Sequence, residues 1–201
     1  MEKLVFYLLV LVVTLPYTTV SGATPSNSMN FIKASCRTTL HPTLCVNCLS
    51  SYAGSIQGSD HQLAKAAITV SFKNTKSAFV FLSKMARVSG IKPREYQAVK
   101  DCISTITNSV TSLSQSVQEL EKMAQTSGQD FEWHMSNVET WVGSALTNQN
   151  MCSRGFAGDS LNGRVKDSIT KRIEYVCQVT SNALALVNRF AVRHRKGIHK
   201  P

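Results

Sequence analysis

The amino-acid sequence predicts an all-α protein: an up-down-up-down four-helix bundle preceded by a short N-terminal helical hairpin and joined by two disulfides. Three observations predict this fold. Apolar residues recur at alternating steps of three and four along four long segments. Short connections separate these segments, so that neighbouring helices must run antiparallel. Six cysteines follow a secretory leader, which places them in an oxidising compartment.

Residues 1–23 are interpreted as a cleaved signal peptide. The residues Met1–Lys3 are followed by an apolar run over residues 4–15 that is too short to span a membrane, and small residues at 21–23 suit a signal peptidase. An uncleaved anchor is the weaker alternative, because Pro16 and Thr18 interrupt the run. We therefore expect a secreted, extracellular protein with one domain over residues 24–192 and a basic tail over 193–201.

The N-terminal helical hairpin is predicted over residues 29–53. The segment is interrupted at Arg37–Thr39 and at His41–Pro42, so it is interpreted as two short helices folded on each other. Cys36 and Cys45 bracket the turn, and a bridge between them would hold together a hairpin that is too short to be stable alone.

The bundle is predicted over residues 60–192. For its first helix, Asp60 is the candidate N-cap and Gly90 the C-terminal glycine. The second helix runs from roughly residue 93 to 126, with Pro93 in its first turn and Gly128 after its end. The apolar seams of these two helices comprise Leu63, Ala67, Val70, Ala78, Phe81, Met85 and Val88, and then Val99, Ile103, Ile106, Val110, Leu113, Val117, Leu120 and Ala124.

The third bundle helix is predicted to end before Cys152, and the fourth to begin at Asn162 or Gly163. Their seams comprise Phe131, Met135, Val138, Val142 and Ala145, and then Val165, Ile169, Ile173, Val176, Thr180, Ala183, Val187 and Phe190. No strand-like alternation is found between these segments.

A second bridge is compatible with this bundle. Cys102 lies near the start of the second helix and Cys152 at the end of the third, and antiparallel neighbours bring those ends together. Cys48 and Cys177 are left over, and the sequence leaves open a third bridge or two free thiols. A metal or redox role for Cys45 and Cys48 is not favoured, because no second cysteine or histidine pair accompanies them.

The sequence predicts no catalytic residues, no cofactor and no metal site. None of the five histidines, His41, His61, His134, His194 and His199, has metal-ligand spacing. Neither a nucleophile elbow nor a glycine-rich phosphate loop occurs. The acidic residues Glu119, Glu121, Glu132 and Glu139 fall on positions typical of solvated helix faces, and His134 is interpreted as packed or half-exposed.

The formal net charge is +10. Behind a secretory leader this charge favours acidic polysaccharide or a membrane surface over nucleic acid, and simple solvation by the tail is an equal alternative. No segment after the leader is apolar enough to span a membrane. The candidate site for an acidic polysaccharide is the basic cluster Arg189, Arg193, Arg195, Lys196 and Lys200.

Several short elements, in this order, resemble the plant invertase/pectin methylesterase inhibitor family. They are Cys36–Thr39, Pro42–Cys45, Ala98–Cys102, Thr140–Thr147, Cys152–Phe156 and Thr180–Leu186. The resemblance covers almost the whole chain after the leader. It implies a non-enzymatic protein, secreted to the apoplast or cell wall, that forms a one-to-one complex with a carbohydrate-active enzyme and blocks its cleft. It also implies bridges Cys36–Cys45 and Cys102–Cys152 and an unpaired cysteine matching Cys177, with Cys48 additional.

The resemblance is closer to the pectin methylesterase inhibitor branch. The run from Trp141 to Thr147 resembles that branch, and the Pro-Lys-Phe element of the invertase inhibitors is absent, so acid invertase is the less favoured partner. A non-inhibitory pectin- or surface-binding module, or a relative of the inhibitor-like region that precedes some pectin methylesterases, is the other alternative.

The expected partner-binding residues flank Cys102 and Cys152. They are Ser104, Asn108, Thr111, Asn148 and Arg154. Ordinary solvated positions are an equal alternative, since exposed polar residues need no special explanation. Members of the esterase branch often carry acidic residues where this chain has Ser104, Asn108 and Arg154, so charge-assisted contacts with the enzyme would differ here.

Overall fold

The structure of the protein, a computed structural model, describes residues 25–123, 128–157 and 163–198. The leader predicted over residues 1–23 lies outside the described residues. Regular structure in the described part is entirely helical, which confirms the predicted fold class. The elements are α2 (Pro25–Cys36), α3 (Pro42–Leu49), the 3-10 turn η1 (Ser50–Tyr52), α4 (Ala53–Ile56), α5 (Asp60–Met85), α6 (Pro93–Lys122), α7 (Gly128–Gly155) and α8 (Arg164–Ile198).

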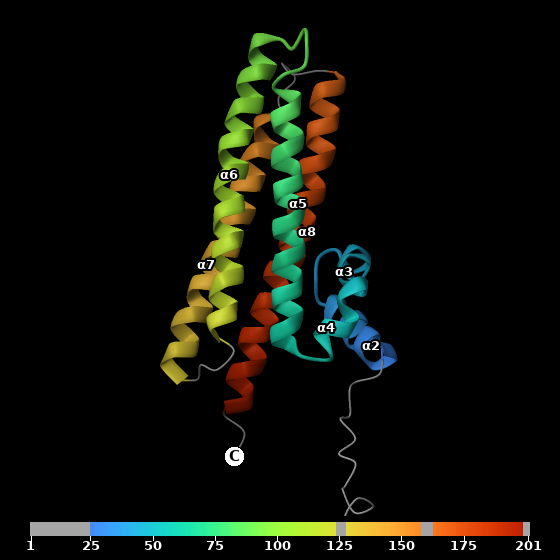
Figure 1. Cartoon of the computed structure of the whole chain (residues 1–201), viewed down its shortest axis with the longest axis vertical. Coiled ribbons are helices and arrows are strands. Elements are labelled where there is room, and N and C mark those ends of the chain that lie inside the picture. The colour runs from blue at the N-terminus through green and yellow to red at the C-terminus, as the bar shows by residue number, and fades with distance from the viewer. Residues whose placement is uncertain (1–24, 124–127, 158–162, 199–201) are drawn as a thin grey trace, which may run out of the picture.

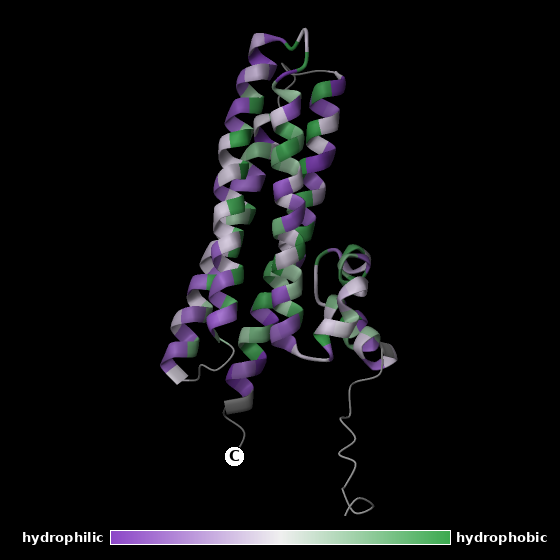
Figure 2. Ribbon diagram, viewed as in Figure 1, coloured by the Kyte–Doolittle hydropathy of each residue, from purple (hydrophilic) through white to green (hydrophobic). Residues whose placement is uncertain are grey.

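Helices α5 to α8 form the predicted up-down-up-down bundle (Figure 1). Helix α5 packs beside α6, α6 beside α7, and α7 beside α8, while α8 closes the ring by packing beside α5. The α5–α8 pair therefore lies opposite the α6–α7 pair. Apolar residues of all four helices are buried between them. The ribbon of each helix carries hydrophobic and hydrophilic residues in turn, as expected of amphipathic helices (Figure 2).

Helix α5 begins one residue earlier than a cap at Asp60 would require. The N-cap is Ser59, whose hydroxyl accepts a hydrogen bond from the backbone N–H of Gln62 at 3.3 Å. Asp60 lies instead in the first turn, so the predicted cap was wrong by one position. The helix ends at Met85, well before Gly90, and Val88 beyond its end is 38% exposed rather than part of the seam.

Helix α6 begins at Pro93 as predicted, since the missing N–H of proline costs nothing in a first turn. The backbone N–H of Lys92 donates to the carboxylate of Glu95 at 3.1 Å and strengthens this start. Its seam is fully buried at Val99, Ile106, Leu113 and Leu120. The helix ends at Lys122, about a turn before the predicted end.

Helices α7 and α8 are both longer than the sequence predicted. Helix α7 begins at Gly128 and continues past Cys152 to Gly155, so the glycine expected to stop one helix starts the next. Helix α8 follows Gly163, whose φ of 115° only glycine adopts readily. It continues through residues 193–198, which were assigned to a separate tail, and there Arg193 pairs with Asp60 and Arg195 with Glu132.

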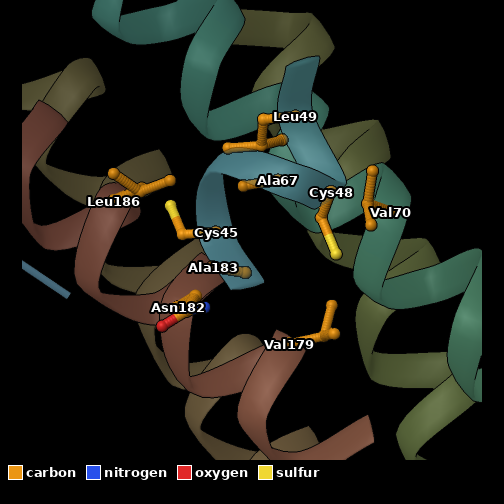
Figure 3. A pocket seen from close by; sticks show the side chains of 9 residues that line it. All are labelled: Cys45, Cys48, Leu49, Ala67, Val70, Val179, Asn182, Ala183 and Leu186. Carbon is orange, nitrogen blue, oxygen red and sulfur yellow. The ribbon is translucent and has the colours of Figure 1, made fainter. Parts of the chain in front are cut away.

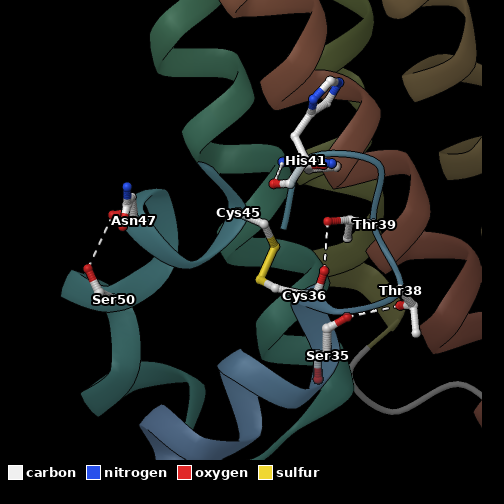
Figure 4. Close-up of a disulfide and its surroundings, with 9 residues drawn as sticks. Ser35, Cys36, Thr38, Thr39, His41, Cys45, Asn47 and Ser50 are labelled. Atoms are coloured by element: carbon white, nitrogen blue, oxygen red, sulfur yellow. Dashed lines mark hydrogen bonds between the residues drawn. A yellow bond between two sulfur atoms is a disulfide. The ribbon is translucent and has the colours of Figure 1, made fainter. Parts of the chain in front are cut away.

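The hairpin α2–α4 lies beside α5 and α8 at the end of the bundle where α5 begins (Figure 1). Two short helices were predicted over residues 29–53, and the structure adds an earlier start at Pro25 and a third helix, α4. The hydroxyls of Thr38 and Thr39 donate to the carbonyls of Ser35 and Cys36 and so end α2 (Figure 4).

Both expected bridges are present. Cys36 is joined to Cys45 with their Cα atoms 5.6 Å apart (Figure 4), and Cys102 is joined to Cys152 with their Cα atoms 4.5 Å apart. Cys48 and Cys177 are free thiols, which answers the question that the sequence left open. Within the described ranges no helix has both the length and the hydropathy needed to cross a membrane.

Candidate functional site on helices α6 and α7

Helices α6 and α7 pack closely because small residues line the side of α6 that faces α7. Ser109 and Ser116 are fully buried there, and the hydroxyl of Ser109 donates to the carbonyl of Ala145 at 3.0 Å. The Cys102–Cys152 bridge joins the same two helices near one end. This packing makes the outer faces of α6 and α7 one continuous, rigid surface, which we call the α6–α7 surface.

The α6–α7 surface is almost uncharged. No Asp, Glu, Lys or Arg occurs from Cys102 to Gln118 on α6, or from Thr140 to Ser153 on α7. Serine, threonine, asparagine and glutamine occupy the exposed positions of both runs, with the exception of Met151. Since the chain carries a net charge of +10, its charge must be concentrated on other faces, chiefly on α5 and α8.

The structure brings three of the five predicted partner-binding residues onto one stripe. Ser104, Asn108 and Thr111 are exposed on α6 and follow one another at helical spacing. On α7, Asn148 is half-buried, with its amide donating to the carbonyl of Ser144 at 2.9 Å, and Arg154 is exposed near the helix end. No hydrogen bond or ion pair within the described part of the chain joins these five residues to one another.

A hollow beside the Cys102–Cys152 bridge adds residues that sequence reasoning missed. Its volume is about 430 Å³. Met151 lies at its edge and is 51% exposed, which is unusual for a large apolar side chain. The sequence did contain a signal, because Met151 does not belong to the apolar seam predicted for the third bundle helix. The lining residues on α6 are Arg94, Gln97, Ala98, Asp101, Cys102 and Thr105.

Glu119 is buried, contrary to the prediction of a solvated face. It is 3% exposed, and its carboxylate lies 2.8 Å from Nδ1 of His134 and 3.1 Å from the amide nitrogen of Asn137. Lys122 donates to the other oxygen at 3.1 Å. Burial by itself would raise the pKa of Glu119, but these hydrogen bonds outweigh it and the pKa is lowered.

The other three acidic positions differ among themselves. Glu121 and Glu132 are exposed, as predicted, and Glu139 is half-buried. His134 is half-buried, in agreement with its interpretation from sequence. In the part of the chain that the structure describes, no group of three or more His, Cys, Asp or Glu side chains could hold a metal ion.

The basic cluster near the C-terminus is largely paired. Arg189 and Arg193 both donate to Asp60 at 3.1 Å, and Arg195 donates to Glu132 at 2.7 Å. Paired guanidinium groups are less available to an acidic polysaccharide, so the cluster is a poorer candidate site than its sequence suggests. Lys196 is exposed, and Lys200 lies outside the described residues.

The chain is similar in sequence to a known protein family. A sequence profile described as plant invertase/pectin methylesterase inhibitor matches residues 30–186. Pectinesterase inhibitor 11 of Arabidopsis thaliana is 44% identical over 202 residues, which cover 96% of this chain and 100% of that protein. Pectinesterase 2 of Arabidopsis thaliana is 29% identical over 163 residues, which cover 81% of this chain but 27% of that longer protein.

The fold agrees with this assignment. A crystal structure of a mutant form of a pectin methylesterase inhibitor from Arabidopsis superposes with a TM-score of 0.63 at 16% sequence identity, covering 78% of this chain and 95% of that chain. At this identity the likeness concerns the fold, whereas the sequence match extends over most of the helices and all four bridged cysteines. The chain belongs to the plant invertase/pectin methylesterase inhibitor family.

Proposed function

We propose that this protein inhibits a plant pectin methylesterase by forming a one-to-one complex in which the α6–α7 surface covers the substrate groove of the enzyme. The observation that carries this proposal is the 44% identity to a pectinesterase inhibitor over nearly the whole chain. The leader expected at residues 1–23 supports secretion to the cell wall, where such an enzyme acts. A role in binding rather than catalysis agrees with the family to which the chain belongs.

The chemistry of the α6–α7 surface suits a protein partner. Uncharged Ser, Thr and Asn side chains can exchange water for hydrogen bonds at lower cost than ionised groups, because burying a charge without a partner is expensive. The hollow beside the bridge, with exposed Met151 at its edge, is large enough to receive a side chain of the enzyme. The closely packed helices would hold these groups in place before binding, which reduces the entropy cost.

Titration of two enzymes tests the proposal. Purified protein is added in steps to a pectin methylesterase and, separately, to an acid invertase, and residual activity is measured. We expect esterase activity to fall until the protein is equimolar with the enzyme and then to stay constant, while invertase activity is unchanged. Protein reduced and unfolded beforehand serves as the control. The proposal would be contradicted if invertase activity fell. It would also be contradicted if both enzymes stayed fully active.

A further inference from the structure

A second surface groove lies along α5 and α8, on the side of the bundle opposite the α6–α7 surface, and hairpin residues complete one end of it. These hairpin residues are Leu44, Asn47, Cys48 and Tyr52. The groove consists of two hollows of about 440 Å³ each. Tyr175 of α8 lines both hollows, so the two adjoin at this residue, and we call them together the α5–α8 groove. Along α5 the lining extends from Val70 to Phe81, a helical distance of roughly 16 Å.

Cations in this groove are held beside aromatic rings. The guanidinium of Arg172 lies over Phe81, 5.4 Å from the ring centroid. The ammonium of Lys73 lies 5.5 Å from the centroid of Tyr52 and donates to the Tyr52 hydroxyl at 3.1 Å. These contacts fix the direction of two long basic side chains, so they lose less freedom when a ligand binds.

The cations of the groove pair with no carboxylate of the described residues. None of Lys73, Lys171 and Arg172 forms an ion pair with a carboxylate among the residues that the structure describes, in contrast to the paired arginines near the C-terminus. The described lining of both hollows contains no Asp or Glu. Glu174, which precedes Tyr175 on α8, is exposed but outside the lining. The groove is therefore a positive site with aromatic walls.

We propose that the α5–α8 groove binds a short acidic oligosaccharide with free carboxylates, such as unesterified galacturonic acid oligomers. Carboxylates of the sugar would bind Lys73, Lys171 and Arg172, and the apolar faces of sugar rings would lie against Tyr175 and Phe81. Because the groove lies opposite the α6–α7 surface, one molecule can bind the polysaccharide and the enzyme together. This site goes beyond enzyme inhibition and does not depend on it.

Direct binding measurements test the groove. The double variant Lys171→Gln/Arg172→Gln should bind an unesterified galacturonic acid oligomer about tenfold more weakly than the unchanged protein, because two charge-assisted contacts are lost. The control Lys33→Gln/Lys100→Gln removes the same charge from exposed positions on α2 and α6 and should bind almost normally. The fully methyl-esterified oligomer should bind no variant.

Cys48 provides a second readout that needs no mutation. Its free thiol lines the groove and lies 3.7 Å from the hydroxyl of Tyr175, and in Figure 3 its sulfur points away from that of Cys45. The oligomer should therefore slow alkylation of Cys48 by N-ethylmaleimide. Burial raises the pKa of the other free thiol, Cys177, to about 11, so Cys177 reacts slowly with or without the ligand.

Three results would overturn the proposal. Equal loss of binding in the two double variants would show that net charge alone attracts the oligomer. Unchanged alkylation of Cys48 at saturating oligomer would place the ligand elsewhere. Equally tight binding of a DNA oligonucleotide or of anionic lipid vesicles would show a general polyanion surface. A far-ultraviolet circular dichroism spectrum like that of the unchanged protein confirms that the Lys171→Gln/Arg172→Gln variant is folded.

Discussion

Glu119 is buried because three donors from two helices hydrogen-bond its carboxylate. Lys122 is one turn away on α6, whereas His134 and Asn137 come from α7, 15 and 18 residues further along the chain. The seam of α6 places Glu119 at the edge of the apolar face, where sequence alone favours solvent. Only the register of α7 against α6 reveals the partners, so the sequence prediction failed here for a tertiary reason.

Replacing Glu119 should therefore destabilise the bundle. Glu119→Ala removes the carboxylate and leaves the half-buried donors of His134 and Asn137 unpaired. We expect the free energy of unfolding at neutral pH to fall by about 2–3 kcal/mol. Glu121→Ala, which breaks only an exposed pair with Lys65, should change it by less than about 1 kcal/mol. Urea denaturation of the oxidised proteins measures both values.

The same residue gives a pH dependence of known sign. Because folding lowers the pKa of Glu119 from its ordinary value of 4.5, the stabilisation by the ionised carboxylate is complete above that value and is lost as pH falls through the lower folded pKa. The stability difference between the unchanged protein and Glu119→Gln should thus shrink on acidification below about pH 4.5. A difference independent of pH, or equal effects at positions 119 and 121, would show that the carboxylate is not held as described.

At the scale of elements, the sequence predicted which segments are helical better than where they end. Apolar seams located α5 to α8 because each seam faces the common core. Gly90 and Gly128 were assigned to helix ends, but Gly90 lies in the turn after α5 and Gly128 begins α7. Both have positive φ, so glycine correctly marks a turn without showing on which side of it the helix lies.

One asparagine of α8 hydrogen-bonds the hairpin to the bundle. Asn182 of α8 is 4% exposed, accepts a hydrogen bond from the backbone N–H of His41 at 3.1 Å and donates to the His41 carbonyl at 3.0 Å. Both bonds lie at the start of α3, just before the bridged Cys45. Asn182 belongs to the element Thr180–Leu186, which contributed to the family resemblance. The sequence does not reveal that Asn182 contacts His41, because the two residues are 141 positions apart.

Asn182→Ala should loosen the hairpin without unfolding the bundle. Loss of the two partly buried hydrogen bonds leaves the backbone N–H of His41 unpaired, whereas the His41 carbonyl keeps its hydrogen bond from the N–H of Cys45. We expect the free energy of unfolding to fall by about 1–3 kcal/mol. Hydrogen exchange should accelerate in α2–α4 and remain slow in α6 and α7. Asn188→Ala, an exposed position on the same helix, is the control. Uniform acceleration in all helices would show that the hairpin and the bundle unfold as one unit.

At the scale of the whole molecule, an uncharged surface and a positively charged groove lie on opposite sides of the bundle. The α6–α7 surface is nearly uncharged, while the α5–α8 groove presents Lys73, Lys171 and Arg172 without acidic partners among the described residues. The uncharged runs are visible in the sequence. Their position opposite the basic groove is not, since it depends on how four helices close into a ring.

This arrangement separates two proposed contacts. The enzyme would occupy the α6–α7 surface, where Ser104, Asn108 and Thr111 share a stripe, and the acidic oligosaccharide would occupy the α5–α8 groove. Sequence reasoning placed the enzyme contact near the Cys102–Cys152 bridge but assigned polysaccharide binding to the C-terminal arginines. Those arginines are occupied by Asp60 and Glu132, which lie far from them in sequence.

The most direct test of the account compares inhibition of a pectin methylesterase by two variants from opposite sides of the bundle. Asn108→Arg places a bulky charge in the middle of the uncharged α6 stripe and should weaken inhibition at least about tenfold, because that charge would be buried against the enzyme. Lys171→Gln/Arg172→Gln should inhibit like the unchanged protein. Full inhibition by the first variant together with loss of inhibition by the second would contradict the account.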